Sequence, residues 1–154
     1  MRFIQKVILV SFFVLGISLN ANTMFLLTKI PKAYLVVENY TSVLPMSFKK
    51  EILAEMKYYT DELKIDTSGY SHRTLAFIMY ETVLDNKPVI SIDLVLGEEV
   101  KRLDDNEQVY ALTFEKRHQM TYSGKSEYEI KEKVLEYVDL LLNDFSEQYK
   151  EDNL

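Results

Sequence analysis

The chain contains no cysteine and no tryptophan, and it has only four glycines, three prolines and two histidines among its 154 residues. Without cysteine, disulfides, thiolate nucleophiles, zinc–sulfur sites, iron–sulfur clusters and a lipid-modified cysteine are all excluded. The glycines form no phosphate-binding loop, and no Gly-x-Ser-x-Gly nucleophile elbow occurs. The fold must therefore be held together by its hydrophobic core, which a domain of about 130 residues can provide.

The charge of the chain is acidic, with 24 Asp and Glu residues against 18 Lys and Arg and a formal charge of −6. A domain of that charge repels phosphate backbones and anionic lipid surfaces. We therefore predict no nucleic-acid partner. The 47% hydrophobic and 27% charged residues are ordinary for a globular protein and argue against disorder.

The N-terminus has the three-part layout of a secretory signal peptide. Arg2 and Lys6 precede the apolar run Val7–Leu19, and the small residue Ala21 follows at the expected cleavage point. We predict a signal peptide over 1–21, a single domain over 28–150, and a periplasmic or secreted location. The alternative is an uncleaved anchor, extended through Met24–Leu27, which would be the only membrane contact.

The segment from Thr74 to Tyr122 predicts three consecutive strands. Apolar and polar residues alternate with period two, so one face is expected to be buried and the other exposed, as in an antiparallel meander. A turn at 85–88 and a polar connection at 103–107 separate the strands. They are predicted over 75–83, 89–96 and 109–122, and the buried side of the third is predicted to carry Tyr110, Leu112, Phe114 and Met120.

Two amphipathic helices flank these strands. Ser47 is a candidate N-cap for a helix that runs to about Lys64, and Ser126 with Glu129 fits a capping box for a second helix that runs to about Tyr149. Both segments carry apolar residues at spacings of three and four, which predicts one buried stripe on each helix. Residues 151–154 are expected to fray.

A first strand is expected within 28–40, after Pro31. Ala33, Leu35 and Val37 lie on one of its faces, and the other face is also largely apolar, which favours a central position in the sheet. The element order is then β-α-β-β-β-α. We predict an α+β two-layer sandwich, with two helices on one face of a four-stranded, mainly antiparallel sheet.

The residues that could carry chemistry are few. His72 and His118 lack the spacing of a metal-binding pair, so they indicate structural or solvated side chains. The acidic pairs Glu98-Glu99 and Asp104-Asp105 could bind calcium or act as acid and base, but they lack the spacing of a calcium loop and are interpreted as a charged connection. We predict no catalytic residue, no metal site and no cofactor.

The exposed face of the predicted sheet carries a richer set of polar residues. Asp93 or Glu81 could approach Arg117 across neighbouring strands and form charge pairs. The functional alternative is that this face docks a partner, and the eleven tyrosines suit an interface because each has an apolar and a polar end. The residues of this candidate interaction face are Glu81, Asp93, Thr113, Glu115, Arg117 and Gln119.

The last predicted helix also carries a resemblance. Its segment 138–145, Val-Asp-Leu-Leu-Leu-Asn-Asp-Phe, resembles the closing helix of small exported proteobacterial proteins of unassigned function. The strand–helix–strands–helix order is similar to that of periplasmic domains related to the curli secretion channel and to lipoprotein activators of penicillin-binding proteins. The chain lacks the lipid-bearing cysteine of those activators. The resemblance implies an envelope location and transfers no site residue.

These observations favour an exported, non-enzymatic periplasmic protein that binds another envelope protein. A carrier of a small apolar ligand, held between sheet and helices, is the first alternative. A hydrolase is the second, and it requires the carboxylates of Glu81, Asp93, Glu98 and Glu115 to converge in one cleft.

Overall fold

The structure is a computed structural model that describes residues 27–154, so the predicted signal peptide lies outside the described residues. No helix in the described part combines the length and the apolar character needed to cross a membrane. The predicted order β-α-β-β-β-α is confirmed. The elements are β1 (Tyr34–Tyr40), α2 (Phe48–Glu62), β2 (Arg73–Leu84), β3 (Lys87–Lys101), β4 (Gln108–Thr121) and α3 (Glu127–Asp152).

The four strands form one mixed sheet in the spatial order β1-β2-β3-β4. β1 is parallel to β2, whereas β2, β3 and β4 pair antiparallel. The mainly antiparallel sheet is thus confirmed, but the central position expected for β1 is wrong. In this order β1 pairs with β2 alone, so β1 lies at an edge of the sheet. Its second apolar face is partly exposed, with Tyr34 and Tyr40 reaching solvent.

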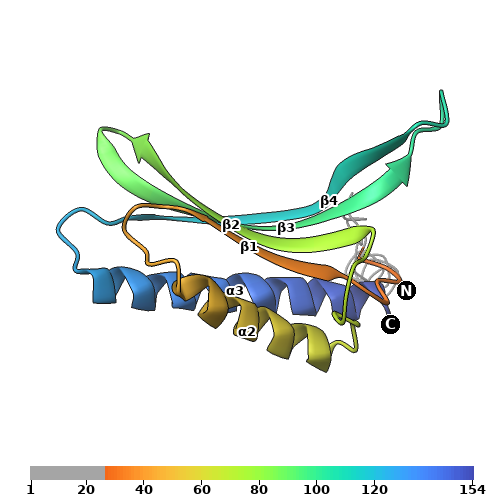
Figure 1. The fold of residues 1–154 in the computed structure, drawn as a ribbon, viewed down its shortest axis with the longest axis horizontal. Coiled ribbons are helices and arrows are strands. Elements are labelled where there is room, and N and C mark those ends of the chain that lie inside the picture. Colours follow the sequence, from red (N-terminus) through yellow and green to blue (C-terminus); the bar gives the residue numbers. More distant parts are fainter. Residues whose placement is uncertain (1–26) are drawn as a thin grey trace, which may run out of the picture.

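Both helices pack on the same face of the sheet, α2 below β1 and α3 below β3 and β4 (Figure 1). The α2 residues Phe48, Ile52 and Met56 recur at every fourth position and are fully buried. Apolar side chains fill the space between the layers. The largest fully buried ones are Phe48, Phe77, Phe145, Leu27, Ile30, Ile52, Met56, Leu75, Met79, Ile90, Ile92 and Leu94.

The predicted helix starts differ in how they are capped. Ser126 and Glu129 form the expected capping box, in which the serine hydroxyl accepts from the Glu129 N–H and the glutamate accepts from the Ser126 N–H at 2.8 Å. Ser47 precedes α2 as predicted, but its side chain makes no capping hydrogen bond.

The C-terminus is fastened to the start of the described domain, so the expected fraying is wrong at 151–153. α3 continues to Asp152, whose carboxylate accepts a hydrogen bond from the Leu27 N–H at 2.6 Å. The amide of Asn153 donates to the Leu27 carbonyl at 2.8 Å and accepts from the Lys29 N–H at 3.1 Å. These bonds hold the last helical turn in place.

The sheet bends away from the helices at both of its hairpins, so its free face is concave along the strand direction (Figure 1). We call this surface the open face. The β3–β4 hairpin projects beyond the helical layer, and Leu103 near its tip is fully exposed. No helix or strand within residues 27–154 covers the open face.

Candidate functional site

The strand register places the open-face residues in rows across the sheet. Cross-strand partners lie on the same face, so four rows can be followed from β1 to β4 and a fifth from β2 to β4. The middle strands, β2 and β3, contribute mostly small side chains, and the larger polar side chains belong to β4. From one end to the other, the rows are Tyr34-Thr74-Gly97-Leu112, Val36-Ala76-Val95-Glu115, Glu38-Ile78-Asp93-Arg117, Tyr40-Tyr80-Ser91-Gln119 and Thr82-Val89-Thr121.

Asp93 and Arg117 form the central interaction of the open face. The guanidinium of Arg117 donates two hydrogen bonds of 2.7 Å to the two carboxylate oxygens of Asp93. Its Nη2 also donates to Glu115 at 3.1 Å, and the Tyr80 hydroxyl donates weakly to Asp93 at 3.4 Å. Bonding to Asp93 raises the pKa of Arg117. The predicted charge pair between Asp93 and Arg117 is therefore present, and it fixes the Arg117 side chain in one orientation.

A second pair lies next to this one. The Gln119 side-chain amide donates to the hydroxyl of Ser91 at 2.8 Å, and Ser91 is fully buried beneath it. The side chains that β4 sends across β3 thus satisfy the buried polar groups of β3, namely Asp93 and Ser91. The described part of the chain has no buried side-chain nitrogen or oxygen without a partner.

Glu81 does not belong to the open face, and its predicted placement there is wrong. It pairs in register with Ile90, whose side chain is buried against the helices, so Glu81 points to the helical side. There its carboxylate accepts from the backbone N–H of Ser42 at 2.6 Å and from the Ser42 hydroxyl at 2.9 Å. These bonds lower the pKa of Glu81 against the opposing effect of burial. Glu81 thereby anchors the loop between β1 and α2.

A β-bulge changes which residues of β4 face outward. The pairing moves from Leu96–Phe114 to Gly97–Leu112, so Thr113 is the extra, unpaired residue. Because the bulge reverses the alternation, Tyr110 and Leu112 lie on the open face and not on the buried side as predicted. Both are more than half exposed.

Tyr110 crosses the open face and joins three strands. Its hydroxyl donates to the backbone carbonyl of His72 at 3.1 Å and lies 3.3 Å from the Thr74 hydroxyl. A Cβ atom at Gly97 would come within 3.1 Å of the tyrosine ring, so the ring would have to shift by a few tenths of an ångström to accommodate any other residue. Sequence reasoning missed this contact, because Gly97 and Tyr110 meet only through the strand pairing.

The free edge of β4 is the second feature of the site. β4 has 14 residues and β1 has 7, and both are edge strands. The Tyr122 N–H donates to Pro88 in β3 at 3.4 Å, and antiparallel bonds recur at every second residue. The even-numbered residues from 114 to 120 therefore bond to β3. The N–H and C=O groups of Glu115, Arg117, Gln119 and Thr121 point outward, away from β3.

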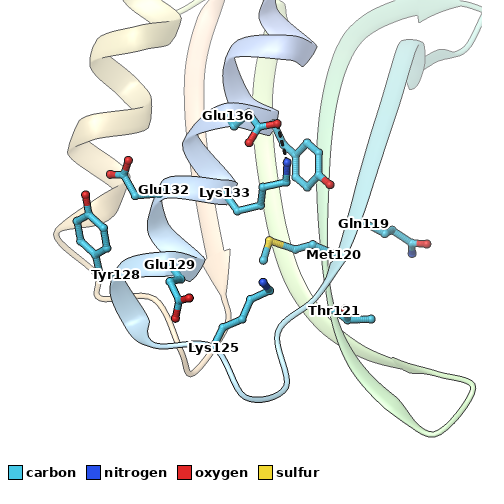
Figure 2. A pocket seen from close by; sticks show the side chains of 10 residues that line it. Gln119, Met120, Thr121, Lys125, Tyr128, Glu129, Glu132, Lys133 and Glu136 are labelled. Atoms are coloured by element: carbon cyan, nitrogen blue, oxygen red, sulfur yellow. Dashed lines mark hydrogen bonds and ion pairs between the residues drawn. The ribbon is translucent and has the colours of Figure 1, made fainter.

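A groove runs beside this free edge, between the end of β4 and the first turns of α3 (Figure 2). Its volume is about 800 Å³. The ring of Tyr137 stacks on His118 at a centroid distance of 4.8 Å, and the Lys133 ammonium lies 4.7 Å from the centroid of the same Tyr137 ring. The lining residues are Gln119, Met120, Thr121, Lys125, Tyr128, Glu129, Glu132, Lys133, Glu136 and Tyr137.

The other chemical candidates are held apart. His72 pairs through Nδ1 with Glu99 at 2.6 Å, and Arg73 pairs with Glu98. Arg102 pairs with Asp104 and Asp105 at the hairpin tip. Residues 27–154 contain no group of three or more side chains arranged to hold a metal ion. The hydrolase alternative requires four carboxylates in one cleft. Asp93 and Glu115 share Arg117, whereas Glu81 binds Ser42 and Glu98 binds Arg73 elsewhere in the fold.

Comparisons with known proteins include structural likenesses to two bacterial lipoproteins. No protein-family model and no curated protein sequence matches the chain. A minor lipoprotein from Acinetobacter baumannii is 11% identical, covers 79% of this chain and 91% of its own, and has a TM-score of 0.38. The rare lipoprotein B from Shewanella oneidensis is 10% identical, covers 75% of this chain and 94% of its own, and has a TM-score of 0.35.

Proposed function

We propose that this chain is an exported, non-enzymatic module of the cell envelope that binds another protein through the open face and the β4 side of its sheet. The single observation that carries the proposal is the open face itself. It is concave, it is uncovered by the described elements, and its polar side chains are already held in fixed positions. A partner would therefore order few side chains on binding, which lowers the entropic cost of association.

The composition of the surface supports a protein partner. Tyr34, Tyr110 and Leu112 offer exposed apolar area at one end of the open face, and Arg117 lies at its centre. Tyrosine and arginine are the residue types that contribute most at protein–protein interfaces. Export is supported by the N-terminal sequence pattern.

The carrier alternative gains no support from the packing. The space between sheet and helices, where the ligand was expected, is filled by large buried side chains such as Phe48, Phe77 and Phe145. The groove beside β4 lies at the surface instead.

Photo-cross-linking in intact cells tests the proposal. A photoreactive amino acid at Leu112 on the open face is expected to give a discrete protein adduct in the envelope fraction. The matched control at Glu62, an exposed residue of α2 on the opposite side of the molecule, is expected to give none. The mature chain should begin at Asn22. Equal adducts at both positions, or a chain that stays in the cytoplasm, would contradict the proposal.

A further inference from the structure

The two edges of the sheet differ in length and in protection. Exposed edge strands invite pairing with another chain unless they are short, bulged, or guarded by charges or proline. β1 is short, and Lys49 of α2 reaches its Glu38 at 3.0 Å. β4 is twice as long and contains no proline. Its bulge is at Thr113, and its one inward-pointing lysine, Lys116, lies 3.8 Å from Asp144 of α3.

Beyond Lys116 the edge of β4 lacks such protection. Arg117, Gln119 and Thr121 present outward N–H and C=O groups, and no backbone hydrogen bond from the described residues reaches that side. The side chains of Arg117 and Gln119 are drawn inward over β3 by Asp93 and Ser91. The backbone edge is therefore left accessible along this half of the strand.

The groove provides space for a chain that pairs with this edge. It follows the same half of β4, and α3 forms its other wall (Figure 2). The apolar part of its lining is the half-buried Tyr137 and Met120, which is 6% exposed, and the acidic part is Glu129, Glu132 and Glu136. The Lys125 side chain extends into the groove from the β4–α3 turn, where it interacts electrostatically with Glu129. A strand added here would place alternate side chains in the groove and on the open face.

We propose that β4 binds an extended segment of the partner protein as a fifth, antiparallel strand. The inference rests on the proposed protein-binding function and specifies how the partner is held. The segment has apolar residues at every second position, facing Met120 and Tyr137, and polar residues between them, beside Arg117 and Gln119. An acidic residue near its end would pair with Lys125. The main chain provides affinity, and the alternation of side chains provides selectivity.

Antiparallel addition makes a specific prediction about the partner's amides. Directly opposed residues that exchange hydrogen bonds have their side chains on the same face of the sheet. The outward groups of β4 belong to Arg117, Gln119 and Thr121, whose side chains are on the open face. The amides of the segment that bond to β4 must therefore belong to its polar residues, whereas the amides of its apolar residues point to solvent.

Synthetic peptides test this prediction. The probe is an acetylated and amidated eight-residue peptide in which valine alternates with threonine and one end carries glutamate. Binding is followed through the backbone amide resonances of the isotope-labelled mature chain. We expect shifts at Glu115, Arg117, Gln119 and Thr121. A peptide N-methylated on its threonine amides should lose binding at least tenfold, because each lost hydrogen bond weakens binding about fivefold. A peptide N-methylated on its valine amides should retain binding.

Two variants of the chain provide the matched control. Gln119→Pro removes an outward N–H that the β3–β4 ladder does not use, so the fold should persist and peptide binding should fall about fivefold. Gln119→Ala removes the side chain and keeps the main-chain N–H, so it should lose less peptide binding than Gln119→Pro. The urea midpoint of each variant reports whether it is folded, and the methylated peptides test the same bond if Gln119→Pro unfolds.

The opposite results would overturn strand addition. The first such result is the absence of amide shifts along β4 when peptide is added. The second is equal binding of both methylated peptides. The third is a concentration-dependent dimer in sedimentation that shifts the same amides without peptide. Cross-linking from Leu112 that survives Gln119→Pro, together with such peptide results, would leave the protein-binding function standing and reject the β4 edge as its site. If the chain with the photoreactive residue at Leu112 and no other substitution gives no adduct, the protein-binding function itself is rejected.

Discussion

The coupling energy between Asp93 and Arg117 tests whether this pair holds the open face in place. The Asp93 side chain is 8% exposed and accepts two charge-assisted hydrogen bonds of 2.7 Å, whereas Arg117 is 44% exposed. Removing one partner of a fully buried ion pair costs about 3–5 kcal/mol. Water can enter where the arginine stood, so we expect Arg117→Ala to lower the free energy of unfolding by about 2 kcal/mol.

The opposite substitution should cost less. In Asp93→Ala the freed guanidinium keeps Glu115 at 3.1 Å and is accessible to water, so we expect a loss of about 1 kcal/mol. Because each single variant loses the same interaction, the double variant should lose less than the sum, with a coupling energy of about 1–2 kcal/mol. Urea denaturation of the four proteins measures these differences, provided that the slope with denaturant is unchanged.

Lys57 and Asp61 on α2 provide the control pair. Their ammonium and carboxylate groups are 3.0 Å apart, but both side chains are more than half exposed. Exposed pairs at this spacing contribute only a few tenths of a kcal/mol, so the same cycle should give a much smaller coupling. A coupling for Asp93 and Arg117 no larger than that of the control would refute the view that the open face is held rigid by this pair.

Two further predictions concern tyrosines. Gly97→Ala should destabilise the fold by about 1 kcal/mol, because the new methyl group meets the Tyr110 ring at 3.1 Å; in a Tyr110→Ala background the same change should cost nothing, as thermal unfolding of the four proteins can show. Burial and the hydrogen bond donated to Asp139 at 2.7 Å raise the pKa of Tyr59 to about 12, so its phenolate should form well above pH 10 in an ultraviolet titration. The folded state holds this proton more tightly than the unfolded state. The stabilisation that Tyr59 contributes is therefore fully present below pH 10 and is lost between about pH 10 and 12. Normal titration of every tyrosine near pH 10 would contradict this.

The order and type of the elements could be read from local patterns. The three strands within 74–122, the two helices and the Ser126–Glu129 capping box were predicted from residues close in sequence, and all are confirmed. The boundaries were less accurate, since β3 continues through Gly97 to Lys101 and α3 reaches Asp152. Contacts with distant residues, such as Asn153 with Leu27, stabilise these ends, and local propensity does not report them.

The candidate face was predicted in part. Asp93, Glu115, Arg117 and Gln119 do lie together on the open face, because strict alternation was sufficient to orient them. Glu81 was misplaced. Its position in the alternation puts it on the helical side of the sheet, and a charged residue is found there because it bonds to Ser42, which is distant in sequence. Tyr110 and Leu112 were misplaced because one extra residue at Thr113 reverses the alternation, and a bulge has no reliable local signal.

By itself, the sequence determined the fold class, the acidic charge, the dependence on a core without disulfides, and the period-two pattern that separates a buried face from a polar one. These properties follow from composition and from spacing between near neighbours. The tertiary structure alone decided which strands lie at the edges, that the open face is concave, and that a groove accompanies the free edge of β4. Strand order, bulges and the path of α3 depend on pairing between distant residues, which periodicity in a single chain does not encode.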